Sequence, residues 1–187
     1  MGLYISETPQ GSNPYLKRLQ VVRGSIIEQN VDAIVTLIPQ TLEYRGAINQ
    51  LIQKAAGEKI DVFIQENVVH PRAGDVYAVP GFDLPCKHIF FCVVPVWRDE
   101  WDRHNSQLLN ASRKAMELAS RMSLKTIAFP PIGSGSHGFP KARAVRLIVQ
   151  GITDRLDKKF EQVQIVCQKA ETQQLFEERL RAESLRL

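Results

Sequence analysis

The residues best suited to chemistry lie in a glycine-rich loop in the second half of the chain. An apolar segment, 127–132, leads into it, and its residues are Gly133, Ser134, Gly135, Ser136, His137, Gly138 and Phe139. Backbone amides can turn toward a guest at glycine because no Cβ stands in the way. Successive amides in such a turn form a concave anion site, and a following helix N-terminus adds partial positive charge. The loop therefore predicts a polyphosphate site; the alternative from composition alone is a flexible strand-to-helix connection.

The composition is that of one ordinary globular domain. The chain has 187 residues and a formal net charge of +4, which suits an anionic ligand but is too small to indicate a nucleic-acid binder. Its three cysteines have no Cys-x-x-Cys spacing, so we expect reduced thiols in the cytoplasm, with no structural metal and no cofactor. No apolar run reaches the length of a membrane span, so we expect no membrane association.

The order of the expected elements positions this loop. We expect an N-terminal extension over residues 1–17 and a single domain over 18–187, including a C-terminal helix. Strands are expected at 19–22, 33–38, 75–79, 87–94, 126–129 and 162–167. Helices are expected at 48–56, 58–67, 105–122, 141–156 and 171–183, with Asn105 as a possible N-cap.

Strands that alternate with helices, several of them apolar throughout, predict an α/β sheet covered on both faces. In such sheets ligands bind beyond the carboxyl ends of the strands. The loops that follow Val22, Ile38 and Phe129 are therefore candidates for one shared cleft.

Three stretches, taken in their order and spacing, resemble the macrodomain, an ADP-ribose-binding module. The first is Arg-Gly-Ser-Ile at 23–26 with Val-Asp-Ala-Ile-Val at 31–35; the second is Arg-Gly-Ala-Ile at 45–48 before Ala-Ala-Gly at 55–57; the third is 127–140. The resemblance covers roughly residues 18–170. It implies a three-layer α/β/α fold with a central mixed sheet, and ADP-ribose or a related nucleotide as the partner.

The resemblance also assigns roles by position. The turn that would hold adenine consists of Gly24, Ser25 and Ile26. The segment that would close over the diphosphate and the distal ribose consists of Arg45, Gly46, Ala47 and Ile48. The loop from Ile132 to Phe139 would hold the diphosphate through its amides.

The chain departs from the family pattern at the adenine position. Ser25 stands where the family usually has an aspartate that accepts a hydrogen bond from the adenine amino group. Charge-assisted hydrogen bonds are roughly twice as strong as neutral ones. We therefore expect weaker or less selective adenine binding.

The positions that hydrolytic relatives use for catalysis are also replaced. Thr36 and Pro39 align with their asparagine, Asn49 with their aspartate, and Gln53 with their histidine. Side-chain amides cannot act as a general base near neutral pH. His137 is the one titratable side chain in the glycine-rich loop, and it is a candidate both for acid–base catalysis and for packing against the distal ribose.

These observations lead to three hypotheses. The first is a binding module for ADP-ribose or a related nucleotide diphosphate that does not catalyse a reaction, a pseudoenzyme. The second is a divergent hydrolase of ADP-ribosyl or related phosphoester bonds, which would depend on His137. The third is an interaction module for nucleic acid, poly-ADP-ribose or a protein such as an ADP-ribosylated one, which would use the basic surface.

Overall fold

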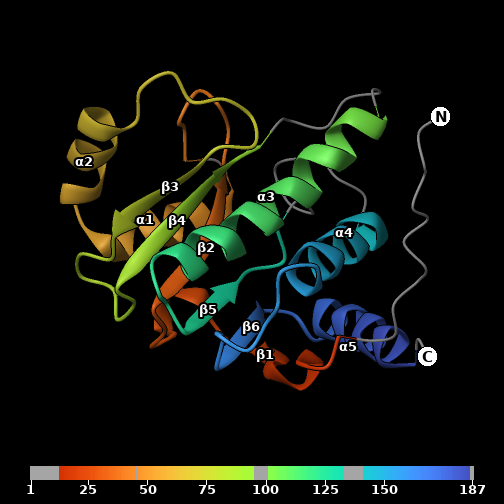
Figure 1. The fold of residues 1–187 in the computed structure, drawn as a ribbon. Helices are drawn as coiled ribbons and strands as arrows, with labels where there is room; N and C mark the ends of the chain where they lie inside the picture. Colours follow the sequence, from red (N-terminus) through yellow and green to blue (C-terminus); the bar gives the residue numbers. More distant parts are fainter. Residues whose placement is uncertain (1–12, 45, 95–100, 133–140, 186–187) are drawn as a thin grey trace.

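The computed structural model describes residues 13–44, 46–94, 101–132 and 141–185, which form one six-stranded sheet with helices on both sides (Figure 1). The strands are β1 (Leu19–Arg23), β2 (Ala33–Ile38), β3 (Val76–Pro80), β4 (His88–Val93), β5 (Thr126–Phe129) and β6 (Gln162–Cys167). The helices are α1 (Ala47–Ala56), α2 (Lys59–Asn67), α3 (Trp101–Arg121), α4 (Lys141–Thr153) and α5 (Ala170–Ser184). Two short 3-10 turns, η1 (Leu16–Arg18) and η2 (Ile26–Glu28), flank β1.

The sheet is mixed, as expected. Its strand order is β1-β6-β5-β2-β4-β3. The four pairings among β1, β6, β5, β2 and β4 are parallel, and only the outer strand β3 runs antiparallel to its neighbour β4. The carboxyl ends of β1, β2, β5 and β6 therefore lie at the same edge of the sheet.

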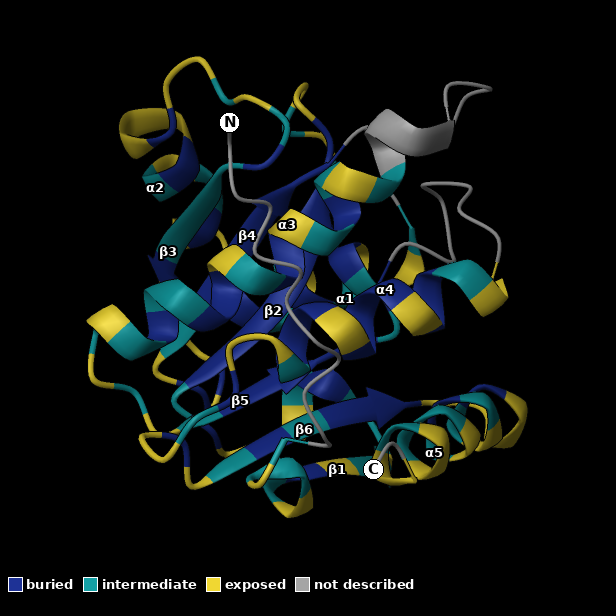
Figure 2. Ribbon diagram, turned by 45° about the vertical axis from the view of Figure 1, so that its right-hand side comes forward, coloured by how far each residue is buried: buried dark blue, intermediate teal, exposed yellow. Residues whose placement is uncertain are grey.

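The side chains of β2 alternate between the two faces of the sheet, and each face is covered by its own layer of helices. All six residues of β2 are buried because helices cover both faces of the sheet (Figure 2). Val35 and Leu37 pack with α3, α4 and α5, whereas Ile34 and Ile38 pack on the opposite face with α1 and α2. Successive side chains of a strand point to opposite faces, so one apolar run serves two cores. This confirms the expected three-layer α/β/α fold.

Helix α3 begins earlier than its sequence predicts. It starts at Trp101, so Asn105 lies inside the helix and the suggested N-cap at Asn105 is wrong. No glycine or proline lies between the two residues to stop the helix, and a capping preference alone cannot end it.

Residues 13–18, near the boundary expected at residue 17, contact the domain. The Asn13 side-chain amide donates to the carbonyls of Thr153 and Leu156, each at 2.8 Å. Tyr15 and Leu16 pack against the core on the α4 side. Within the described ranges, no helix is both long and apolar enough to cross a bilayer.

Candidate functional site

The candidate cleft lies where β1, β2 and β5 end. The loops that follow these strands leave the same edge of the sheet, since the strands are parallel members of one sheet. The turn after β1 is tied to β6, because the Gly24 amide donates to the Cys167 carbonyl at 3.0 Å. Helix α1 contacts η2, which brings the turn after β1 beside the helix that follows β2.

The turn after β1 contains Gly24, Ser25 and Ile26. Ser25 precedes η2, and its backbone carbonyl accepts hydrogen bonds from the Glu28 amide at 3.2 Å and the Gln29 side chain at 2.9 Å. Its hydroxyl makes no capping hydrogen bond to η2. Ile26 is buried in the core on the α1 side, so its side chain anchors the turn, and only its backbone is suited to a ligand contact.

The start of α1 has the properties of an anion site. Gly46 adopts φ +84°, a left-handed conformation that glycine reaches without a Cβ clash. The N-cap residue of α1 is Gly46, which has no side chain to cap the helix, and the first turn contains no acidic residue. The first amides of a helix have no partner within the helix, and they carry partial positive charge. Gly46, the exposed Ala47 and Ile48 therefore present amides that can bind a phosphate.

Asn49, at the position where the family resemblance places a catalytic aspartate, is a buried structural amide. Thr36 Oγ1 donates to Asn49 Oδ1, and Asn49 Nδ2 donates to the Leu37 carbonyl. Thr36 and Asn49 are only 2% and 3% exposed. Both side chains therefore connect α1 to β2, and this pair contains no group that could act as a general acid or base near neutral pH.

Gln53, at the position where the family resemblance places a catalytic histidine, contacts the Asp61 carboxylate, a neighbour that the sequence did not predict. Its side-chain amide donates to both Asp61 oxygens, at 3.1 and 3.2 Å. Burial, reinforced by the neighbouring Asp61 carboxylate, raises the pKa of the Tyr44 phenol well above its usual value. Gln53 and Asp61 are eight positions apart on different helices, so no motif spacing indicates this cluster.

The loop between β2 and α1 packs inward in part. Pro39 is buried, and the Tyr44 ring meets the edge of Phe91 with ring centroids 6.2 Å apart. Arg45 lies outside the described residues, so its role stays a prediction.

The loop after β5 begins with the buried Ile132, whose amide donates to the Pro130 carbonyl at 2.7 Å. The remaining predicted residues, Gly133, Ser134, Gly135, Ser136, His137, Gly138 and Phe139, lie outside the described residues. Their contact with a diphosphate stays a prediction. Elsewhere in the chain, the described part contains no group of three or more His, Cys, Asp or Glu placed to hold a metal ion.

Comparison with known proteins identifies the family of this chain. A family model described as Macro domain matches residues 39–148, more than half of the chain. The chain belongs to the macrodomain family. A macro domain-containing protein of Xanthomonas axonopodis pv. citri is 37% identical over 144 residues, which cover 73% of this macrodomain and 79% of that protein.

Two further relatives carry names or titles that bear on chemistry. A Salmonella newport protein named O-acetyl-ADP-ribose deacetylase is 32% identical over 164 residues, which cover 85% of this macrodomain and 92% of that protein. A solved variant of the Oceanobacillus iheyensis macrodomain with ADPR is 26% identical and superposes with a TM-score of 0.80, over 88% of this chain and 92% of that one.

Proposed function

We propose that this macrodomain binds ADP-ribose or a related nucleotide diphosphate and does not catalyse hydrolysis of ADP-ribosyl or related phosphoester bonds. The observation that carries the proposal is the Thr36–Asn49 pair, whose buried neutral groups are engaged with each other and with the Leu37 carbonyl. The uncapped start of α1 supports the binding part, since its amides suit a phosphate. The solved Oceanobacillus iheyensis relative with ADPR supports the same ligand class.

Calorimetric titration tests the binding part. We expect saturable heat of binding with ADP-ribose. The two comparison ligands are ADP, a shorter competitor, and ribose 5-phosphate, which lacks the diphosphate. Absence of binding by ADP-ribose and by other nucleoside diphosphates at millimolar concentration would contradict the proposal.

Turnover measurement tests the non-catalytic part. We expect no release of acetate from O-acetyl-ADP-ribose beyond the uncatalysed rate at saturating ligand. The second candidate function is this hydrolysis, and it is favoured by the 32% identity to the Salmonella newport protein named as a deacetylase. If turnover occurs, loss of the rate in His137→Ala would assign the acid–base role to that side chain.

We also propose a cytoplasmic location. Cys86, Cys92 and Cys167 are all buried and free. Unpaired thiols are typical of proteins kept in a reducing compartment.

A further inference from the structure

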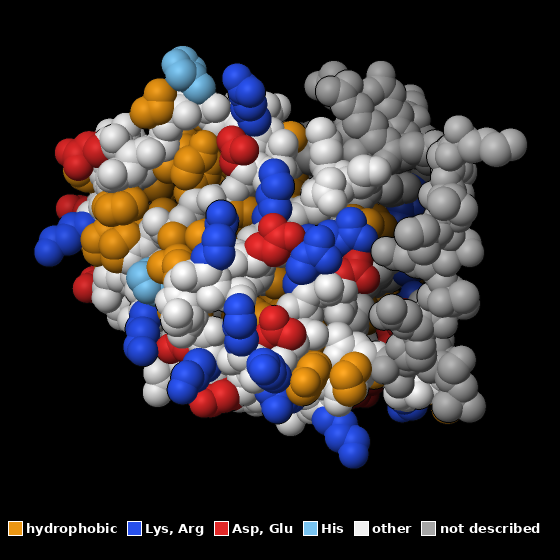
Figure 3. Space-filling view, viewed as in Figure 1, with side chains coloured by type: hydrophobic (Ala, Val, Ile, Leu, Met, Phe, Trp, Pro, Cys, Tyr) orange, Lys and Arg blue, Asp and Glu red, His pale blue; other side chains and the backbone are white. Residues whose placement is uncertain are grey.

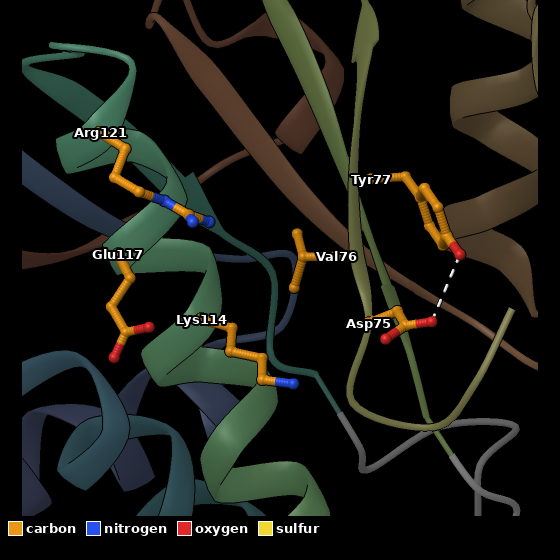
Figure 4. Close-up of a pocket in the computed structure, with 6 residues that line it drawn as sticks. All are labelled: Asp75, Val76, Tyr77, Lys114, Glu117 and Arg121. Atoms are coloured by element: carbon orange, nitrogen blue, oxygen red, sulfur yellow. Dashed lines mark hydrogen bonds between the residues drawn. The ribbon is translucent and has the colours of Figure 1, made fainter. Parts of the chain in front are cut away.

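A groove separate from the candidate cleft lies between the outer strand β3 and helix α3. Its volume is about 480 Å³, and it is lined by Asp75, Val76, Tyr77, Lys114, Glu117 and Arg121 (Figure 4). None of these residues comes from the turns after β1, β2 or β5.

The strand beside the groove has an open edge. In the described sheet β3 is the terminal strand and pairs only with β4. The Val93 amide donates to the Asp75 carbonyl at 2.8 Å, and the Gly81 amide donates to the Lys87 carbonyl at 2.9 Å. Hydrogen-bonded positions alternate in an antiparallel pair, so the backbone groups of Val76 and Ala78 point away from β4. Both residues offer an amide and a carbonyl to a further strand.

Proline limits this open edge at one end. Pro80 is the next outward-facing position of β3, and it has no amide to donate. A further strand would therefore form its ladder with Val76 and Ala78 and would end near Pro80.

The groove is lined by two cations and two carboxylates, and only the cations extend across it from α3 (Figure 4). Lys114 and Arg121 extend from α3 toward β3, whereas the Glu117 carboxylate points away from it (Figure 4). Glu117 pairs with Arg155 at 2.7 Å. Asp75 accepts hydrogen bonds from the Arg72 amide at 2.9 Å and the Tyr77 hydroxyl at 3.3 Å.

Lys114 and Arg121 are exposed, and neither has an ion-pair partner among the described residues. Figure 3 shows that Lys and Arg side chains on this face are interspersed with Asp and Glu. The formal net charge of +4 favours the approach of an acidic ligand to the chain.

We propose that β3 and α3 form a docking site for an extended acidic peptide segment. The segment adds to the sheet at Val76 and Ala78, and its carboxylates bind Lys114 and Arg121. Main-chain hydrogen bonds to an open strand edge are a known source of peptide affinity, while the side chains on one face of the peptide provide specificity.

The spacing of the two cations fits alternate residues of such a segment. Lys114 and Arg121 are seven positions apart on α3, which is about 10 Å along the helix axis. Alternate residues of a strand lie about 7 Å apart on one face. Two long cationic side chains can therefore reach carboxylates at positions i and i+2 of the segment.

The probe is a capped peptide with alternating residues, acetyl-Val-Glu-Val-Glu-Val-Glu-Val-amide, and the readout is amide hydrogen exchange of the full chain by NMR. We expect the peptide to slow exchange at Val76 and Ala78, because their outward amides gain partners. Lys114→Glu combined with Arg121→Glu should weaken peptide binding about tenfold or more, since two favourable charge contacts become repulsive.

Two controls make the test specific. Lys158→Glu combined with Lys169→Glu changes the net charge equally at exposed positions of other elements, and it should leave the affinity within about twofold. Ala78→Pro removes one outward amide without removing a hydrogen bond to β4. In this variant the peptide should no longer slow amide exchange at the edge of β3. Unchanged exchange at Val76 and Ala78 with saturating peptide would overturn the proposal. Competition by inorganic phosphate together with unchanged exchange would indicate a small-anion pocket and would overturn it as well.

Discussion

At the scale of single residues, Asn49 and Gln53 bear on the proposed lack of catalysis. The family resemblance places catalytic groups of hydrolytic relatives at these two positions, and here both side chains are neutral and form hydrogen bonds within the fold. Asn49 bonds to Thr36 and Leu37, and Gln53 bonds to Asp61. A nearby carboxylate, Asp61, is present, but it is already engaged by Gln53.

The single substitution Asn49→Asp should destabilise the fold without creating hydrolytic activity. In Asn49→Asp, a buried carboxylate would face the Leu37 carbonyl in place of the amide donor. We expect the free energy of unfolding to fall by about 2 kcal/mol at pH 7, because a buried donor is lost and a charge is buried. Urea unfolding measures the change in the free energy of unfolding. Acetate release from O-acetyl-ADP-ribose is the second readout, and it should show no activity in the variant.

The matched control is Asn67→Asp. Asn67 also donates from its side-chain amide to a carbonyl, that of Phe63 at 2.8 Å, but it is exposed. Asn67→Asp should lower the free energy of unfolding by less than about 0.5 kcal/mol. An equal decrease in the free energy of unfolding in Asn49→Asp and Asn67→Asp would contradict the structural role of Asn49.

Ser25 offers a test of adenine recognition. Ser25→Asp should tighten ADP-ribose binding about fivefold, because a carboxylate forms a charge-assisted hydrogen bond with the adenine amino group. Calorimetric titration measures the change. The inosine analogue of ADP-ribose lacks that amino group and should gain nothing; an equal gain with both ligands would show that Ser25 does not contact the base edge.

At the scale of elements, α1 is the part that both holds the fold and presents the candidate site. Its inward residues Ile52 and Ala56 are fully buried against the sheet. Its first turn is left without a cap and without an acidic residue. An element anchored in this way can hold its free amides in position for an anion without further ordering.

Ala47→Glu should separate the stability of α1 from ligand binding. A carboxylate in the first turn interacts favourably with the helix dipole by about 0.3–1 kcal/mol, so the melting temperature should not fall. The same charge would repel a diphosphate, so ADP-ribose binding should weaken about tenfold. Calorimetry and thermal unfolding together check both effects.

Gln65→Glu is the control for this change. Gln65 is exposed on α2, and its replacement changes the net charge by the same amount without altering the start of α1. We expect unchanged affinity in this variant. A similar loss in both variants would mean that net charge, and no site at α1, governs the affinity.

At the scale of the whole molecule, one carboxylate joins three strands at the edge opposite the candidate cleft. Asp32 accepts hydrogen bonds from the amides of Lys125 and Thr126, at 2.8 and 3.1 Å, just where β5 begins. Its carbonyl accepts from the His88 amide at 3.0 Å, and its carboxylate pairs with Lys87 at 3.2 Å. Burial alone would raise the pKa of Asp32, but these hydrogen bonds and the ammonium group outweigh it and lower the pKa.

The lowered pKa predicts how Asp32 contributes to stability as pH changes. The contribution should be complete above about pH 4, the pKa of an unfolded aspartate, and lost as the pH falls through the lower folded pKa. Asp32→Asn should therefore reduce the free energy of unfolding by about 1–2 kcal/mol at pH 7, and the difference from the native chain should shrink toward pH 2. Urea unfolding at both pH values, with the exposed Asp83→Asn as control, measures this. If Asp32→Asn and the native chain still differed in the free energy of unfolding at pH 2, the stabilising role assigned to the ionised Asp32 would be contradicted.

Much of the fold could be predicted because it depends on local periodicity. The unbroken apolar run at 33–38 predicted a strand buried on both faces, and β2 is that strand. The stripe of Ile48, Ile52 and Ala56 predicted α1 to within a residue. The start of α3 was missed, since nothing local separates a true cap at Asn105 from an asparagine inside a longer helix.

The candidate site could be predicted only in part. Spacing and order placed the turn after β1 and the start of α1 in one family pattern, and the parallel sheet brings them to one edge. The partners of Asn49 and Gln53 could not be predicted, because they depend on how α1 packs against β2 and α2. The same applies to the groove between β3 and α3, whose lining residues come from segments about forty positions apart.

The sequence by itself determined the succession of strands and helices and the family, and it predicted neutral side chains where the family resemblance places catalytic groups. These properties depend on residue type and short-range spacing. Only the tertiary structure decided that Asn49 is buried and internally satisfied, that Asp61 meets Gln53, and that β3 keeps an open edge beside two cations. Side-chain partners and strand edges are fixed by contacts between distant segments, and a local pattern does not contain that information.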